Sequence, residues 1–220
     1  RKMDELSHMS KIDDRLIKGY QKFRDTVFES DRALYEELAS SGQKPHTLMI
    51  ACSDSRVLPQ QILSAGPGDL FVVRNVAAMV PPYERDSGYH GTSAAIEFAV
   101  TVLEVDNIVV MGHAGCGGVA SVIDHSMPTD SFVHNWMRPL REWLRAHEDF
   151  DEQDDAESQR MLERAAVHLS LQNLKSFPFV RERMEAGTLS VIGFIFDIHN
   201  GDLSQVRAKQ KITLDVESLG

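Results

Sequence analysis

Two cysteines and a histidine of this 220-residue chain have the residue types and the spacing of a metal site. Cys52 ends an apolar run, and His113 and Cys116 follow a second apolar run within the sequence GHAGCGG. Zinc prefers thiolate and imidazole ligands in tetrahedral geometry, and three protein ligands leave a fourth position for water, as in catalytic sites. A helix beginning near Cys116 would favour its thiolate. Each cysteine taken singly can instead be a small buried apolar residue, so the hypothesis needs all three residues together.

A carboxylate and a guanidinium follow the first cysteine at two-residue spacing. In extended backbone, Cys52, Asp54 and Arg56 point the same way. A carboxylate so placed can occupy the fourth position on a metal, and a bidentate contact with Arg56 would hold Asp54 off it. In isolation such a pair is usually a surface ion pair. Beside a metal ligand, we interpret Asp54 and Arg56 as a catalytic pair that orients the reacting water.

Short apolar runs place these residues at the ends of predicted strands. Their near-continuous hydrophobicity is typical of a parallel sheet covered on both faces. Helical patterns alternate with them, which predicts an α/β fold with a central, mostly parallel sheet flanked by helices. Because ligands gather at the carboxyl ends of parallel strands, two neighbouring strand ends would bring the three metal ligands together. The predicted strands are 47–51, 70–73, 107–111, 189–196 and 203–206, and the predicted helices of this region are 92–103, 117–123, 131–147 and 156–175.

The two ends of the chain have their own patterns. Residues 1–42 are predicted to be a helical arm, with an apolar stripe that must pack on the chain itself or on a partner subunit. Asn200-Gly201 is a hairpin signal, so the final strand is predicted to be antiparallel at the sheet edge. The acidic run 148–157 is interpreted as a solvated loop and helix start. We expect a single domain over 1–220, with the arm before a zinc core at 43–220. The stripe consists of Ile12, Leu16, Tyr20, Phe23 and Val27.

Composition narrows the classes of partner. With 42% hydrophobic and 25% charged residues, the chain is ordinary for a soluble protein. A net charge of −10 disfavours nucleic acid, and no stretch approaches the roughly 18 apolar residues of a membrane span. Two cysteines do not make a disulfide framework, and the first ten residues lack a signal-peptide core, so we expect a cytoplasmic protein, although a targeting segment could have been removed. The glycine order needed for a dinucleotide is absent from 112–118.

The pattern Cys-x-Asp-x-Arg followed by His-x-x-Cys resembles the beta-class carbonic anhydrases. The likeness is close over about residues 40–124 and includes 71–77 and 112–118. It implies one zinc ion per chain and the reversible hydration of carbon dioxide to bicarbonate by zinc-bound hydroxide. It also implies a homo-oligomer, a dimer or a dimer of dimers, with the active site at the subunit interface and the arm wrapped around the partner.

The same resemblance assigns substrate-binding residues. Gln43 matches the glutamine that binds substrate in plant-type members, and Phe71 and Val76 match apolar walls of the pocket, in which we also place Gly117. A second branch of the family has a tryptophan where this chain has Met49, and uses it in a bicarbonate switch at lower pH. The chain therefore resembles the plant-like branch and is expected to keep water on its zinc, without that switch.

Three positions depart from the plant-type pattern. Phe98 replaces a tyrosine, Val102 replaces a histidine proposed as proton shuttle, and Ala78 replaces an asparagine. Proton export must then use another group, with Tyr89, His90 or buffer as candidates.

Two rival functions fit the same residues. Carbon disulfide or carbonyl sulfide hydrolysis uses this scaffold with a different access channel. A non-catalytic zinc module would need a fourth histidine or cysteine to close the site.

Overall fold

The structure is a computed structural model that describes residues 13–86, 88–147, 155–208 and 214–218. The chain divides into two compact units, Arg1–Gln43 and Lys44–Gly220. The boundary lies one residue from that of the predicted arm. Whether the two units act as one domain stays a prediction.

The N-terminal unit is helical, as expected. It contains α2 (Asp14–Phe23), a π-helical segment η1 (Arg24–Phe28) and α3 (Arg32–Ser41). Leu16 and Tyr20 of the predicted apolar stripe are more than half exposed, and Ile12 lies outside the described residues. Whether this stripe packs on the chain itself or on a partner subunit stays a prediction.

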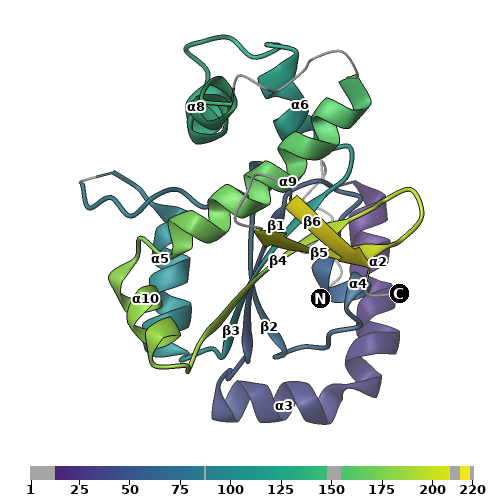
Figure 1. Cartoon of the computed structure of the whole chain (residues 1–220). Coiled ribbons are helices and arrows are strands. Elements are labelled where there is room, and N and C mark those ends of the chain that lie inside the picture. The colour runs from purple at the N-terminus through teal and green to yellow at the C-terminus, as the bar shows by residue number, and fades with distance from the viewer. Residues whose placement is uncertain (1–12, 87, 148–154, 209–213, 219–220) are drawn as a thin grey trace. The chain divides into compact units, whose positions relative to one another are not determined.

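The second unit is built on one six-stranded sheet with the order β2-β1-β3-β4-β5-β6 (Figure 1). The first four strands in this order are parallel, and β5 and β6 each run antiparallel to the strand before them. The predicted fold class is thus confirmed. The sequence did not predict β6, which pairs with β5 and forms the edge of the sheet. The strands are β1 (Thr47–Cys52), β2 (Leu70–Asn75), β3 (Asn107–His113), β4 (Ser190–Phe196), β5 (Leu203–Ala208) and β6 (Leu214–Ser218).

The predicted hairpin forms between β4 and β5. Gly201 has a φ of +82°, a left-handed conformation that glycine adopts without steric cost. The Asp197 N–H donates to the Asp202 carbonyl oxygen at 2.8 Å and closes the turn.

Helices cover both faces of the sheet. Leu48 and Ile50 are buried in one apolar cluster, while Met49 and Ala51 are buried in another, so β1 is enclosed on both sides. This arrangement explains the continuous apolar runs. In the described residues, no helix combines the length and apolarity needed to cross a bilayer. The helices are α4 (Pro59–Ile62), η2 (Val76–Ala78), α5 (Gly91–Glu97), η3 (Phe98–Val102), α6 (Gly117–Ile123), α7 (Phe132–Trp136), α8 (Arg138–Arg145), α9 (Asp155–Leu174) and α10 (Pro178–Glu185).

The helical predictions hold with two qualifications. The region 131–147 forms two helices, α7 and α8, separated at Met137. Pro139 explains the break, because proline fits the first turn of a helix but disrupts a helix interior. Helices α4 and α10 were not anticipated. Of the acidic run 148–157, residues 148–154 lie outside the described residues, and α9 begins at Asp155.

Helix α9 lies across the sheet and packs on β3 and β4 (Figure 1). A Cβ atom added at Gly193 would lie 2.7 Å from Val167 Cγ1 and 2.9 Å from Leu171 Cδ1. Val167 is buried and β-branched, so its side chain has little freedom to move away. The absent side chain of Gly193 therefore sets how closely α9 approaches the sheet.

This contact predicts a loss of stability for Gly193→Ala. Overpacking is expected to lower the free energy of unfolding by about 1–3 kcal/mol, measured by urea unfolding. Gly91→Ala is the matched control, because its added Cβ has nothing within 4 Å. Equal stability of the two variants would contradict the packing described here.

Candidate metal centre

The three predicted metal ligands meet at the carboxyl ends of two neighbouring strands. Cys52 is the last residue of β1, His113 is the last residue of β3, and Cys116 is the N-cap of α6. Their ligand atoms all lie within 4.8 Å of one another, and all three residues are buried. The parallel pairing of β1 with β3 brings together residues about sixty positions apart in sequence.

The spacing of the two sulfur atoms fits one tetrahedral cation. Two metal–sulfur bonds of about 2.3 Å at the tetrahedral angle place the sulfur atoms about 3.8 Å apart. The Cys52 and Cys116 Sγ atoms are 3.9 Å apart, and both cysteines are free rather than disulfide-bonded. The hydrogen bond between the two side chains lowers the pKa of Cys52, and the same contact together with burial raises the pKa of Cys116.

His113 directs one ring nitrogen at this cluster. Its Nδ1 donates to the Ala114 carbonyl oxygen at 2.9 Å, which assigns the Nε2 lone pair to the inside of the site. Among the described residues, the buried Nε2 has no hydrogen-bond partner. An orphaned acceptor beside two thiols fits a bound cation, because buried polar atoms are otherwise paired.

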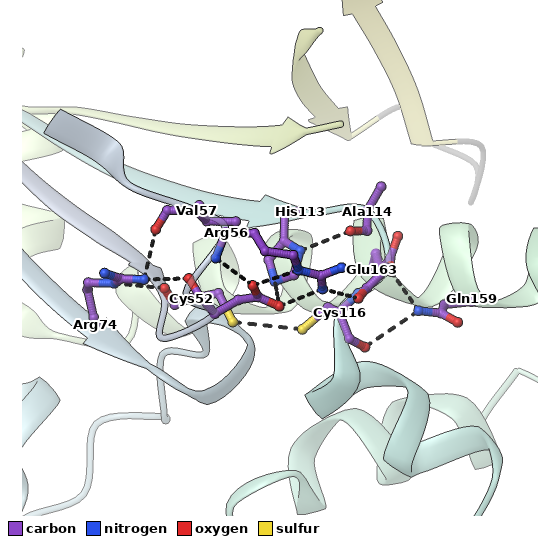
Figure 2. A network of polar contacts seen from close by, with 11 residues as sticks. Cys52, Arg56, Val57, Arg74, His113, Ala114, Cys116, Gln159 and Glu163 are labelled. Carbon is purple, nitrogen blue, oxygen red and sulfur yellow. Dashed lines mark hydrogen bonds and ion pairs between the residues drawn. The ribbon is translucent and has the colours of Figure 1, made fainter. Parts of the chain in front are cut away.

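Asp54 and Arg56 form the predicted bidentate pair. Arg56 Nε donates to Asp54 Oδ1 at 2.9 Å, and Nη2 donates to Oδ2 at 2.7 Å (Figure 2). Asp54 Oδ2 also lies 3.8 Å from His113 Nε2, close to the cluster but engaged by Arg56. The hydrogen bonds from Arg56 hold the pKa of the Asp54 carboxyl well below its usual range. Because this pKa is depressed in the folded state, the pair stabilises the fold above the ordinary aspartate pKa and ceases to do so only in strong acid.

Arg74 holds the backbone on which this pair stands, a role the sequence did not predict. From β2 it donates to the carbonyl oxygens of Cys52 at 2.9 Å, Asp54 at 2.6 Å and Val57 at 2.8 Å (Figure 2). Three bonds from one guanidinium fix the loop after β1. A charged residue inside an otherwise apolar strand was the only available signal.

Two further residues approach the site from α9. Glu163 is only 3% exposed, and its Oε1 accepts the Cys116 N–H at 3.0 Å. Gln159 Nε2 donates to the same Oε1 at 3.0 Å. Burial raises the pKa of Glu163. A glutamate directly after a leucine and shortly before two alanines and a valine in the predicted helix was the signal that could have found it.

Comparison with known proteins identifies the family. A family profile described as "Carbonic anhydrase" matches residues 47–203. The protein "Beta carbonic anhydrase 3" of Arabidopsis thaliana is 38% identical over 210 residues, covering 90% of this chain and 80% of that protein. The chain belongs to the beta-class carbonic anhydrases.

Solved beta-class carbonic anhydrases share the fold. The structure titled "The structure of the beta-carbonic anhydrase CcaA" is 32% identical with a TM-score of 0.83, covering 97% of this chain and 93% of that one. A structure from a study of two tetrameric beta-carbonic anhydrases of Sordaria macrospora is 31% identical with a TM-score of 0.79, covering 88% and 95%. The beta-carbonic anhydrase CafA of Aspergillus fumigatus is 30% identical with a TM-score of 0.78, covering 90% and 94%.

The residues predicted to bind substrate in this beta-class chain lie in different places. Gly117 directly follows Cys116, and Val76 packs near Gly118, whose added Cβ would lie 2.6 Å from Val76 Cγ1. Cys52 pairs with Asn75 in the sheet, and Phe71 lies four residues before Asn75. Phe71 is therefore about 13 Å along β2 from the level of Cys52. Gln43 belongs to the N-terminal unit. The structure therefore brings Val76 and Gly117 to the metal cluster of their own chain but not Phe71, and the role of Gln43 stays a prediction.

Two cavities flank the site. One of about 640 Å³ is lined by Val76, by the candidate proton shuttles Tyr89 and His90, and by Phe132 and Trp136 among others. Trp136 Nε1 donates to the Val76 carbonyl oxygen at 2.9 Å and fixes the wall between this cavity and the cysteines. The other, of about 390 Å³, is bordered by polar groups, including Arg56, Gln159, Glu163 and His199.

Proposed function

We infer that this chain catalyses the reversible hydration of carbon dioxide to bicarbonate and a proton, with one zinc ion held by Cys52, His113 and Cys116. The observation that carries this inference is the three-ligand cluster with Asp54 held beside it by Arg56. Membership of the beta-class carbonic anhydrases supports the same reaction.

The donor set fits zinc and leaves room for a reactant. When bound, zinc acts as a Lewis acid and lowers the pKa of a water molecule towards neutrality. In the described residues, the cluster has three ligand atoms and no fourth cysteine, histidine or carboxylate. A non-catalytic zinc module would be closed by a fourth ligand, so the geometry supports a catalyst instead.

Asp54 orients the reacting water. Its Oδ2 faces the cluster and keeps lone pairs free, so it would accept a hydrogen bond from a water molecule held at this site. That bond aims an oxygen lone pair at carbon dioxide, which is an effect of orientation. Arg56 prevents the carboxylate from taking the water's place, because both Asp54 oxygens are engaged by its guanidinium.

The rest of the pocket needs a second subunit. We propose a homodimer, or a dimer of dimers, in which Phe71 and Gln43 serve the metal centre of the partner. Phe71 lies too far along β2 to line its own cluster, and the Sordaria relative is described as tetrameric. Light scattering on the zinc-loaded protein should give a dimer or tetramer, and a stable active monomer would contradict the proposal.

We also propose a cytoplasmic location, supported by two cysteines that are free rather than joined in a disulfide.

The decisive experiment combines two measurements on one sample. Stopped-flow hydration of carbon dioxide should be catalysed in proportion to bound zinc, at about one ion per chain. Parallel assays with carbon disulfide and carbonyl sulfide test the rival substrates. A zinc-loaded protein that hydrolysed only a sulfur substrate would overturn the proposal.

The proton-shuttle hypothesis gives a separate prediction for His90. This side chain lines the cavity beside Val76, and its Nε2 lies 2.6 Å from Asp86 Oδ1. His90→Ala is expected to lower kcat in dilute buffer by about 100-fold, the low end for a proton-transfer group, and concentrated imidazole buffer should restore it. Tyr89→Phe tests the other candidate under the same conditions. A kcat of His90→Ala equal to wild type in dilute buffer would exclude His90 as the shuttle.

A further inference from the structure

We propose that Gln159 and Glu163 of α9 act together as positioning residues for the metal ligand Cys116. We call this pair the α9 clamp. The inference rests on the proposed function only in taking Cys116 as a metal ligand. The clamp is expected to set how tightly the site holds its metal.

The α9 clamp grips the backbone on both sides of the Cys116 side chain. Glu163 Oε1 accepts the Cys116 N–H at 3.0 Å, and Gln159 Nε2 lies 3.5 Å from the Cys116 carbonyl oxygen (Figure 2). Gln159 Nε2 also donates to Glu163 Oε1 at 3.0 Å, which orients the carboxylate. The two residues are four apart on one helix, so they project from the same face.

The peptide between Gly115 and Cys116 is held from two directions. Its N–H donates to Glu163, and its carbonyl oxygen accepts from Arg56 Nη2 at 3.1 Å. Gly115 has a φ of +68°, and a glycine allows its neighbouring peptide groups alternative orientations that other residues resist. Contacts from the loop after β1 and from α9 thus select one orientation and one position for the Cys116 sulfur.

The burial of Glu163 indicates that the clamp serves the metal site. A carboxylate that is 3% exposed destabilises a fold unless its oxygens are paired, and an apolar side chain would fill this position more favourably. It accepts hydrogen bonds from the Cys116 N–H and from Gln159, and in the part of the chain that the structure describes no lysine or arginine pairs with it. Groups that orient a metal ligand in this way typically change metal affinity about 10- to 100-fold when removed.

The test measures metal affinity directly, without reference to catalysis. Zinc dissociation constants are determined by competition with a chromophoric chelator for wild type, Glu163→Ala and Glu163→Gln. Glu163→Ala is expected to bind zinc about 10- to 100-fold more weakly. Glu163→Gln keeps an oxygen acceptor for the Cys116 N–H and should recover most of this loss. Glu157→Ala, an exposed carboxylate on the same helix, is the matched control and should leave the affinity unchanged.

Cobalt substitution distinguishes positioning from mere stabilisation. The thiolate-to-cobalt absorption of the Co²⁺-loaded protein reports the geometry of the cysteine sulfurs, and it should shift in Glu163→Ala but not in Glu157→Ala. A lower melting temperature with unchanged zinc affinity and unchanged cobalt spectrum would show a purely structural role and overturn the proposal.

A second variant keeps the test decisive if Glu163→Ala does not fold. Gln159→Ala removes the partly buried amide and should still weaken zinc binding and shift the cobalt spectrum. If both are unchanged, the clamp is refuted. Because the readout is metal binding, a wild type that binds zinc without hydrating carbon dioxide would refute the proposed function and leave the clamp standing.

Discussion

Cys52→Ser, His113→Ala and Cys116→Ser are each expected to remove the metal and the hydration of carbon dioxide together. Each variant deletes or weakens one of three ligands whose donor atoms lie within 4.8 Å of one another. With two ligands left, the site should hold much less than one zinc ion per chain after dialysis, and catalysis should fall by about 10³-fold or more. Metal analysis and stopped-flow hydration on the same preparations measure both effects.

The control for His113→Ala comes from the other end of the same strands. His46 directly precedes β1 and pairs with Asp106, which directly precedes β3, at 3.0 Å. His46→Ala therefore removes a paired histidine at the amino-terminal ends of these strands, away from the metal cluster, and should leave zinc content and hydration rate unchanged. The circular dichroism spectrum of zinc-free wild type should match the spectra of the ligand variants, which would show that the variants lose the metal rather than the fold. A Cys116→Ser protein that kept full zinc and full activity would show that the metal binds elsewhere.

Asp54→Ala is expected to separate metal binding from catalysis. Asp54 is outside the group of three ligands, so the variant should retain about one zinc ion per chain. Its hydration rate should fall by about 10²- to 10⁴-fold, the usual contribution of a positioned acid–base group. Asp106→Ala is the matched control, because it removes a paired aspartate at the amino-terminal end of β3, away from the metal cluster.

The pKa of Asp54 determines how Arg56 contributes. Arg56 holds this pKa well below its usual range. Even at its ordinary value of about 3.9, the carboxyl would be ionised near neutral pH, so Arg56 is needed for the position of Asp54 rather than for its charge. Arg56→Ala should therefore lower the rate without adding an acid limb to the pH–rate profile above about pH 6. A new acid limb near neutrality would show instead that Arg56 acts through the protonation of Asp54.

The sequence by itself determined the parts of this protein that depend on local pattern. Apolar runs predicted the first four strands, because burial on both faces requires such runs. Asn200-Gly201 gave the hairpin, because its backbone conformation depends on residues adjacent in sequence. The types and spacing of Cys52, His113 and Cys116 predicted the metal site, since the carboxyl ends of parallel strands lie on the same side of a sheet.

Only the tertiary structure decided which distant residues support these parts. Glu163 lies 47 positions after Cys116, and Arg74 lies 22 positions after Cys52, yet both bind the backbone of those ligands. Such contacts follow from strand register and from how closely α9 approaches the sheet, and neither is encoded in a local period. The place of Phe71 was likewise fixed by register, because its distance from Cys52 depends on which β2 residue pairs with the end of β1.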